Sequence, residues 1–188
     1  MIRIALVGDI GSGKSYLGKL FKYPTFNADK AVSEIYKKDL NCFKKIKKTL
    51  PKFFNSFPIK KKELINAILF NKKNIKKISK IVHPLVRKKM INFINTNKNK
   101  KFVILDVPLF LENKLEKKSD IIIFVQSNKL EINKRLKTRK NFNIKILKKL
   151  KTLQLPLKTK KKRAEFIIKN DFKKKSVKKE ITKILKLI

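Results

Sequence analysis

The order of apolar and polar residues along the chain predicts strands and helices that alternate over much of its length. Short apolar runs, which suit buried parallel strands, occur at residues 2–7, 25–28, 102–106, 120–125 and 166–168. Apolar residues at helical spacing occur at residues 14–22, 30–37, 128–140, 143–153 and 173–187. Because alternating strands and helices build parallel sheets, we expect an α/β fold with a doubly wound parallel sheet of about five strands.

The middle of the chain differs, because residues from about 40 to 97 contain no convincing strand. Apolar residues recur there at helical spacing, as in the series Ile75, Ile78, Ile81 and Val82. A chain of 188 residues is of the length of one domain. We therefore expect a single domain over residues 1–188, with a helical insertion at about 38–98.

All four glycines lie between residues 8 and 18, and residues 8–15 have the spacing G-x-x-x-x-G-K-S of a phosphate-binding P-loop. An apolar run at residues 4–7 precedes the motif and a helical pattern follows it, which is the context that a P-loop requires. Glycines at these positions let successive backbone N–H groups converge on a phosphate chain. A dinucleotide-binding fingerprint fits less well, because Tyr16 stands where that motif needs a small residue.

The P-loop predicts a nucleotide site. The residues expected to bind the nucleotide are Gly11, Ser12, Gly13, Lys14, Ser15 and Tyr16. Lys14 can reach the β- and γ-phosphates, and Ser15 can hold Mg²⁺. The N-terminus of the following helix adds a partial positive charge. The expected cofactors are therefore ATP and Mg²⁺.

Two carboxylates follow predicted strands, and each allows two interpretations. Asp29, 15 residues after Lys14, can accept a proton from an attacking hydroxyl, or it can cap the following helix. Asp106 ends an apolar run as a Walker B carboxylate does and can hold Mg²⁺, or it is a turn residue at a strand end. Doubly wound sheets bind ligands at the carboxyl ends of their strands, which is where both residues are expected.

Arg135 and Arg139 are two of only five arginines in a chain that otherwise uses lysine. Their spacing of four residues places them on one face of the helix predicted at 128–140. A planar guanidinium that is always charged suits a phosphate better than an ammonium group does. We favour a phosphate clamp for this pair, with exposed ion pairing as the alternative.

Two further motifs are interpreted structurally. His83, the only histidine, precedes Pro84, and we expect a packing or helix-boundary residue, since nothing at ligand spacing accompanies it to form a metal site. Residues 128–131, Asn-Lys-Leu-Glu, are similar to the guanine-reading motif of GTPases, but no glycine follows Gly18 to form the switch of those proteins. We interpret Asn128 as a helix cap and Glu131 as its capping-box partner.

The net charge of +39 raises the question of nucleic-acid binding. Lysine, asparagine, isoleucine and phenylalanine are all abundant and have AT-rich codons, so genome composition accounts for much of the lysine. We therefore interpret the lysines as solvated helix faces with a weak, salt-dependent attraction to polyanions. No specific nucleic-acid partner is expected.

The sequence also bears on location. The single cysteine, Cys42, forbids an internal disulfide and suits a reducing compartment. The apolar run at 121–125 is too short to span a bilayer, and the N-terminus enters a strand without a signal-peptide pattern. We expect a cytoplasmic protein without a membrane partner.

Taken together, these residues resemble the dephospho-CoA kinase family from residue 2 to about 171. The resemblance rests on an ordered set of motifs: the loop at 11–15, Ala28-Asp29, His83-Pro84, the segment 106–112 (similar to the family's Pro-Leu-Leu-x-Glu), Arg135 and Arg139 followed by Gln154, and the segment 164–170 (similar to the closing Ala-Asp-x-x-Ile-x-Asn). The loop alone is shared by many families, and the combination in this order is much more specific.

The resemblance implies transfer of the γ-phosphoryl group of ATP to the 3′-hydroxyl of dephospho-CoA, the last step of coenzyme A synthesis. In that reaction Asp29 would be the general base, Lys14 would hold ATP, and Arg139 with Arg135 would neutralise the transferring group. The residues implied to contact the acceptor substrate are Asp29, His83, Pro108, Leu109 and Glu112. A lid at about 128–160 would close and exclude water.

The chain departs from the family pattern at several positions. Asp9 stands where glycine is usual, Tyr16 where threonine is usual, and Asn27 replaces the first Asp of Asp-Ala-Asp. None of these departures removes Lys14 or Asp29. Two alternatives stay open: another small-molecule or nucleotide P-loop kinase, and a degenerate ATP- or nucleic-acid-binding protein.

Overall fold

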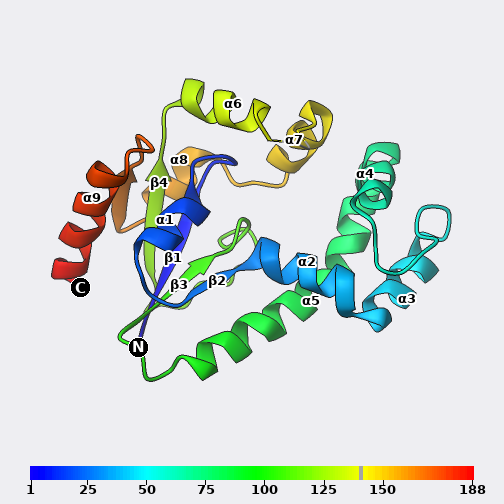
Figure 1. The fold of residues 1–188 in the computed structure, drawn as a ribbon, viewed down its shortest axis with the longest axis horizontal. Helices are drawn as coiled ribbons and strands as arrows, with labels where there is room; N and C mark the ends of the chain where they lie inside the picture. The colour runs from blue at the N-terminus through cyan, green and yellow to red at the C-terminus, as the bar shows by residue number, and fades with distance from the viewer. Residues whose placement is uncertain (140–141) are drawn as a thin grey trace. The chain divides into compact units, whose positions relative to one another are not determined.

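The computed structural model describes residues 1–139 and 142–188, which contain a parallel β-sheet (Figure 1). Its five strands are β1 (Ile2–Gly8), β2 (Thr25–Asn27), β3 (Phe102–Asp106), β4 (Ile121–Gln126) and β5 (Phe166–Lys169). They lie in the order β2-β3-β1-β4-β5, and every neighbouring pair is parallel. The predicted strands are confirmed to within a residue or two at their ends.

Helices connect the strands. In the described part of the chain they are α1 (Lys14–Leu20), α2 (Ala28–Lys38), α3 (Leu40–Thr49), α4 (Lys61–Phe70), α5 (Lys72–Thr96), α6 (Lys129–Lys137), α7 (Ile144–Lys151), α8 (Leu157–Lys162) and α9 (Lys174–Leu187). The connections from β1 to β2 and from β4 to β5 are helical, as parallel strands require. The expectation of a doubly wound α/β fold is therefore confirmed.

The chain forms two compact units, and the first, Met1–Asn27 with Asn97–Phe142 and Lys151–Ile188, contains the sheet. One buried cluster joins β1 to the helices α1 and α9 through Ile4, Leu6, Leu17, Val177 and Ile181. Alternate residues of β1 point to opposite faces of the sheet, so Ile4 and Leu6 share the face that these helices cover. Each fully buried Leu or Ile side chain contributes about 1.5–3 kcal/mol to this core.

The second unit, Ala28–Thr96 with Asn143–Leu150, is helical in all of its regular elements and has a core of its own. Its buried residues come from α2, α3, α4, α5 and the segment between α3 and α4, and they include Ile35, Ile46, Phe54 and Val82. Lys149 of α7 donates from Nζ to the backbone carbonyl oxygens of the last turn of α4, at 2.7 and 2.9 Å. A lysine at this place satisfies carbonyls that have no partner within their own helix.

The helices α2 and α8 differ from the sequence prediction. α2 begins at Ala28, so it follows β2 without a break, whereas the prediction began it at residue 30. α8 was not predicted at all, because its sequence, Leu-Lys-Thr-Lys-Lys-Lys, has no apolar periodicity. It is held instead by Lys160, whose long side chain is buried.

His83 and Pro84 also differ from the prediction, which made His83 a packing or boundary residue. Helix α5 runs through both without ending, and both side chains are exposed. Proline lacks the backbone N–H, so its place in α5 removes one hydrogen bond of the helix. The apolar face of α5, buried at Ile75, Ile78 and Val82, keeps the helix continuous through this defect.

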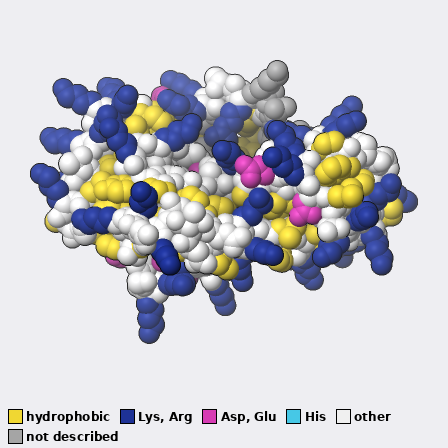
Figure 2. Space-filling model, turned by 60° about the horizontal axis from the view of Figure 1, so that its bottom comes forward, with side chains coloured by type: hydrophobic (Ala, Val, Ile, Leu, Met, Phe, Trp, Pro, Cys, Tyr) yellow, Lys and Arg dark blue, Asp and Glu magenta, His cyan; other side chains and the backbone are white. Residues whose placement is uncertain are grey.

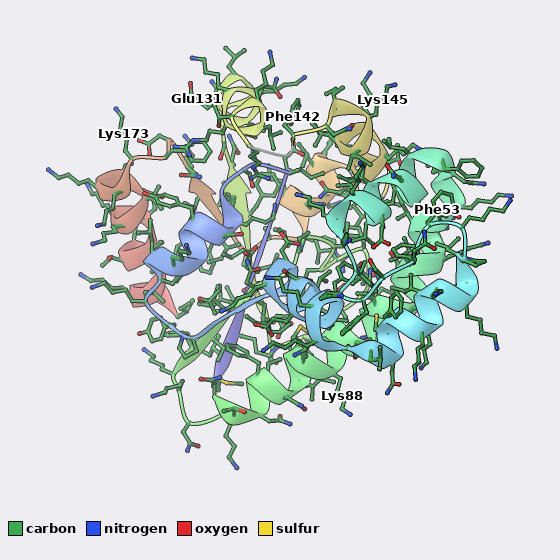
Figure 3. The ribbon with its side chains drawn as sticks, turned by 45° about the vertical axis from the view of Figure 1, so that its right-hand side comes forward. Phe53, Lys88, Glu131, Phe142, Lys145 and Lys173 are labelled. Carbon is green, nitrogen blue, oxygen red and sulfur yellow. The ribbon has the colours of Figure 1, made fainter. Side chains whose placement is uncertain are left out.

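Basic side chains cover much of the surface. Figure 2 shows lysine and arginine spread over the visible face, with few acidic side chains among them. Side chains such as Lys88 of α5 and Lys173, just before α9, extend away from the ribbon (Figure 3). No helix among the described residues is long and apolar enough to cross a membrane.

Candidate active site

The loop between β1 and α1 is shaped by glycines at which a side chain would collide with β4 or with the turn after β5. Gly8 has φ 149° and Gly13 has φ 91°, both in the region that favours glycine. A Cβ atom at Gly8 would lie 2.6 Å from the carbonyl oxygen of Val125, and one at Gly13 would lie 2.3 Å from Nδ2 of Asn170. The backbone of the loop therefore passes close to the ends of β4 and β5.

Two side chains from other segments hold the loop in place. Ser127 donates from Oγ to the backbone carbonyl of Ser12 at 2.8 Å, and Asn170 donates from Nδ2 to the same oxygen at 2.8 Å. The hydroxyl of Ser12 is buried and has no hydrogen-bond partner among the described residues. Buried polar groups are usually satisfied, so this hydroxyl fits a loop that is completed by a phosphate oxygen.

Lys14 lies over this loop. Its side chain is buried, and Nζ donates to the carbonyl oxygens of Gly8 at 3.2 Å and Asp9 at 2.7 Å. A phosphate oxygen is a stronger acceptor for an ammonium group than a backbone carbonyl is. The lysine is therefore positioned where a bound phosphate chain would compete for it.

Asp9, the departure that puts a carboxylate in the loop, is partly neutralised. Its Oδ1 accepts the backbone N–H of Ile10 at 2.7 Å, and its Oδ2 lies 3.8 Å from Nζ of Lys151. Both interactions turn the carboxylate toward its own backbone and a lysine. The side chain of Asp9 thus stabilises the conformation of the loop.

Ser15, Asn27 and Asp106 meet at the carboxyl ends of β2 and β3. Asn27 donates from Nδ2 to Oδ2 of Asp106 at 2.5 Å, and the same nitrogen lies 3.4 Å from Oγ of Ser15. The register of the two strands places Asn27 directly opposite Asp106. A hydroxyl and a carboxylate of this kind are oxygen ligands that suit Mg²⁺.

Arg135 and Arg139 are not related as predicted. α6 ends two residues before Arg139, so only Arg135 is helical. Thr138 donates from Oγ1 to the carbonyl of Arg135 at 3.0 Å, and the N–H of Arg139 bonds to Leu136 O at 3.2 Å. Such local bonds compete with the α-helical pattern and tighten the turn. The argument that both arginines share one helix face is therefore wrong, and the role of Arg139 stays a prediction.

Asn128 and Glu131 begin α6. The cap predicted at Asn128 is confirmed, because Oδ1 accepts the backbone N–H of Leu130 at 2.8 Å. Glu131 lies 3.5 Å from Nζ of Lys134, as an exposed pair on the same helix.

The segment after β3 contains Pro108, Leu109 and Glu112. Pro108 and Leu109 are partly buried. Oε1 of Glu112 lies 2.8 Å from Nζ of Lys160 and accepts the backbone N–H of Leu155 at 2.9 Å. Glu112 thus ties the segment after β3 to α8, and the predicted contact of these three residues with a substrate stays a prediction.

In the second unit, Asp29 lies in the first turn of α2, after Ala28. Its interpretation as the cap of this helix is wrong, because the helix already includes it. A carboxylate in the first turn still stabilises the helix through the helix dipole. The side chain is exposed, and its predicted role as a general base is untested by this geometry.

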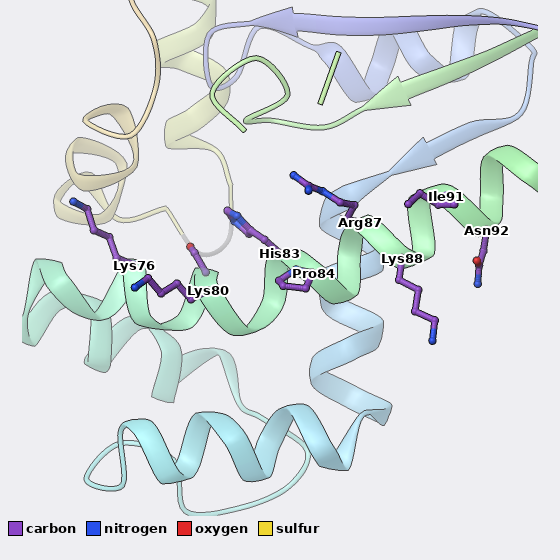
Figure 4. Close-up of a pocket in the computed structure, with 9 residues that line it drawn as sticks. Lys76, Lys80, His83, Pro84, Arg87, Lys88, Ile91 and Asn92 are labelled. Atoms are coloured by element: carbon purple, nitrogen blue, oxygen red, sulfur yellow. The ribbon is translucent and has the colours of Figure 1, made fainter. Parts of the chain in front are cut away.

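A groove of about 640 Å³ runs along α5 and includes His83. It is lined by Lys76, Ser79, Lys80, His83, Pro84, Arg87, Lys88, Ile91 and Asn92. His83 and Arg87 project to the same side of the helix, whereas Lys88 projects to the other side (Figure 4). The groove is rich in positive charge and suits an anionic ligand.

Two residues of these sites were missed from the sequence, Arg87 and Phe172. Arg87 had a weak signal, since arginine is scarce in this chain. Its spacing of four residues from His83 on a helix was a second signal. Phe172 has its ring 3.9 Å from the guanidinium carbon of Arg135, and nothing in the sequence indicated that contact.

A phosphate-binding loop between the first strand and the first helix of a parallel sheet, with a carboxylate at the end of the neighbouring strand, defines a P-loop kinase. The family model of dephospho-CoA kinase matches residues 2–176. This chain therefore belongs to the dephospho-CoA kinase family, and the resemblance stated from the motifs is confirmed.

Individual proteins agree with this assignment. A dephospho-CoA kinase of Rickettsia conorii is 32% identical over 189 residues, which cover 99% of this chain and 97% of that protein. Among solved structures, TT1252 from Thermus thermophilus matches with a TM-score of 0.81 and 22% identity, over 99% of this chain and 96% of that one. A dephospho-CoA kinase from Campylobacter jejuni matches with a TM-score of 0.63 and 23% identity, over 98% and 95% of the two chains. At these identities the structural matches show the fold.

Proposed function

We propose that this protein transfers the γ-phosphoryl group of ATP to the 3′-hydroxyl of dephospho-CoA and so completes coenzyme A synthesis. The observation that carries the proposal is the arrangement of Lys14, Ser15 and Asp106 around one loop and one sheet edge in a chain of this family. The geometry of the loop is the evidence for an ATP site, and membership of the family is the evidence for dephospho-CoA as the acceptor.

ATP would lie with its phosphates on the loop. The backbone N–H groups of residues 11–16, the unpaired hydroxyl of Ser12 and the ammonium group of Lys14 would hold the phosphate oxygens. Lys14 would exchange its present carbonyl acceptors for phosphate oxygens without leaving the loop.

Ser15 and Asp106 would hold Mg²⁺ bound with the nucleotide. The ion supplies positive charge that stabilises the phosphate oxygens. No cluster of three His, Cys, Asp or Glu side chains able to bind a metal occurs among residues 1–139 and 142–188. Ser15 and Asp106 would be two ligands of the ion, and the nucleotide would supply others.

In the transfer step the 3′-oxygen of the acceptor forms a bond to the γ-phosphorus, and the bond from that phosphorus to the bridging oxygen of ADP breaks. Asp29 takes the proton of the attacking hydroxyl. Lys14, Arg135 and Arg139 neutralise the charge on the transferring group. Positioning and electrostatics account for most of such catalysis.

The acceptor would bind along the helical insertion. His83 and Arg87 project into the groove of α5, where the phosphates of dephospho-CoA match the positive charge. Pro108, Leu109 and Glu112 of the first unit are also proposed to contact the acceptor, and residues of about 128–160 are proposed to act as the lid. We propose that the protein is located in the cytoplasm, where both ATP and dephospho-CoA are available.

An acceptor panel tests this function. Purified protein is incubated with labelled ATP, Mg²⁺ and either dephospho-CoA, nucleosides or nucleoside monophosphates. The label is expected on dephospho-CoA, and Asp29→Asn should lose turnover while it keeps ATP binding. Label mainly on a nucleoside or a nucleoside monophosphate would instead make the chain another P-loop kinase. Binding of RNA or DNA at low salt without any transfer would make it a binding protein.

A further inference from the structure

Phe172 has a backbone conformation that phenylalanine rarely adopts. Its φ is 62°, in the left-handed region, where a bulky side chain is strained and glycine is favoured. Such strain persists only where the surroundings impose it, and it concentrates at functional sites. The residue lies in the turn between β5 and α9.

The surroundings that impose this conformation are those of the phosphate loop. Asn170 is buried, accepts the backbone N–H of Phe172 on Oδ1 at 2.9 Å, and donates from Nδ2 to Ser12 O at 2.8 Å. One side chain therefore fixes both the loop and the turn. A Cβ atom at Gly13 would lie 3.0 Å from Cε1 of Phe172, so the ring borders the loop directly.

The ring of Phe172 contacts an arginine from another segment. Phe172 is half-buried, and the guanidinium group of Arg135 lies over its face with the central carbon 3.9 Å from the ring centroid. Arg135 is itself exposed and comes from α6. Two flat groups from different segments are thus stacked beside the loop that would hold the phosphates.

A flat, partly exposed pair of this kind suits one part of a nucleotide above all, its base. A base presents a π face that stacks on aromatic rings and on guanidinium planes, and such stacking does not depend on which base is present. Asn170, the polar side chain next to the ring, already has both ends of its amide engaged. Recognition here would come from stacking.

We propose that Phe172 is a base-stacking residue of the donor site, and that the base of the nucleotide packs against its ring beside the Arg135 guanidinium. This inference rests on the proposed function, because it takes the loop to hold the phosphates. It adds a base-binding residue to the donor site and gives a reason for a strained phenylalanine in this turn.

The test compares ligands with and without a base. ATP and inorganic tripolyphosphate, each with Mg²⁺, are titrated calorimetrically into the wild-type protein and Phe172→Gly, which removes the ring and relieves the backbone strain. We expect the variant to bind ATP about tenfold or more weakly, in line with the loss of one stacked base, and to bind tripolyphosphate unchanged. Phe70→Leu, at an exposed phenylalanine of α4, is the matched control and should change neither affinity.

A fluorescent variant gives an independent readout. The chain contains no tryptophan, so Phe172→Trp places a single indole at the site. Its emission should be quenched by ATP and not by tripolyphosphate. Equal weakening of both ligands in Phe172→Gly would mean that the ring only positions Arg135 or the loop, and that result, or unchanged ATP binding, would overturn the proposal.

The outcomes of the two proposals are separable. Binding that depends on the base and on Phe172, together with no transfer to dephospho-CoA by the wild-type protein, would leave the stacking site standing and reject the acceptor. Transfer to dephospho-CoA by the wild-type protein, together with full ATP affinity in Phe172→Gly, would support the acceptor and reject the stacking site.

Discussion

The side-chain amide of Asn27 donates to the carboxylate of Asp106 at 2.5 Å, across neighbouring strands whose register sets the two residues opposite each other. The same amide nitrogen lies 3.4 Å from the hydroxyl of Ser15. A neutral donor thus stands between the two proposed magnesium ligands. It keeps Asp106 oriented without adding negative charge.

Asn27→Asp should make the protein depend on Mg²⁺ for stability. Two carboxylates in contact repel each other, so without the metal we expect a loss of about 1–2 kcal/mol and a melting temperature lower by a few degrees. Mg²⁺ should restore the loss, because the second carboxylate is a further oxygen ligand. Thermal unfolding with and without Mg²⁺ measures both effects. Asp106→Asn is the control and should show no such rescue, and equal stability of Asn27→Asp in both conditions would contradict the prediction.

Lys14→Met should abolish most phosphoryl transfer with little change in folding. The buried ammonium group would otherwise stabilise charge on the phosphates, and the loss of one such group typically lowers kcat by about 100- to 1,000-fold. Steady-state kinetics with ATP and dephospho-CoA measure the effect, and circular dichroism checks the fold. Lys19→Met removes an exposed lysine from the same helix and should leave kcat within about twofold. Comparable losses of kcat in both variants would show that any lysine of this helix contributes through its charge alone, and would contradict the prediction.

The pair formed by Glu112 and Lys160 should be important for stability. Lys160 is 1% exposed and the carboxylate of Glu112 is 2.8 Å away, so Glu112→Gln leaves a buried ammonium group without its counter-charge. Removal of one partner of a buried ion pair typically costs about 3–5 kcal/mol. Urea denaturation measures this cost. Glu131→Gln breaks an exposed pair with Lys134 and should cost less than about 1 kcal/mol, so similar losses in the two variants would be evidence against the prediction.

Alkaline pH should destabilise the protein through Cys42. Burial, and to a lesser degree the charge of Asp39, raises the pKa of Cys42 from 9.0 to about 11. As pH rises, the thiol therefore loses its proton in the unfolded chain before it does so in the folded protein. Ionisation of Cys42 has no effect on the free energy of unfolding below about pH 8. It lowers that free energy between pH 9 and 11, by at most about 3 kcal/mol. Urea denaturation at several pH values measures the decline.

Cys42→Ala separates this effect from that of its neighbour. Burial also raises the pKa of Tyr36 far above its usual value, and that contribution remains in the variant. We expect the variant to lose the decline between pH 9 and 10. A thiol reagent should also label the wild-type protein slowly at pH 8 unless denaturant is added, since the thiolate is rare and buried. Rapid labelling of the folded protein would contradict both expectations.

The sequence predicted the sheet and the phosphate loop because both depend on local patterns. Apolar runs such as 102–106 need only be buried to become strands, and the glycines at 8–13 fix the turn between β1 and α1 wherever the rest of the chain lies. The helix prediction failed where periodicity was absent or interrupted. α8 has no apolar repeat, and α6 ends early because Thr138 bonds to its own helix.

What the sequence by itself determined is therefore the fold class, the P-loop and the membership of the family. Only the tertiary structure decided which distant side chains meet: Asn27 with Asp106, Glu112 with Lys160, and Phe172 with Arg135. These contacts join residues 37 to 79 positions apart, and they arise from the order and register of the strands and from the packing of α6 and α8. Local patterns carry no information on that order, because it is set by burial of the whole sheet at once.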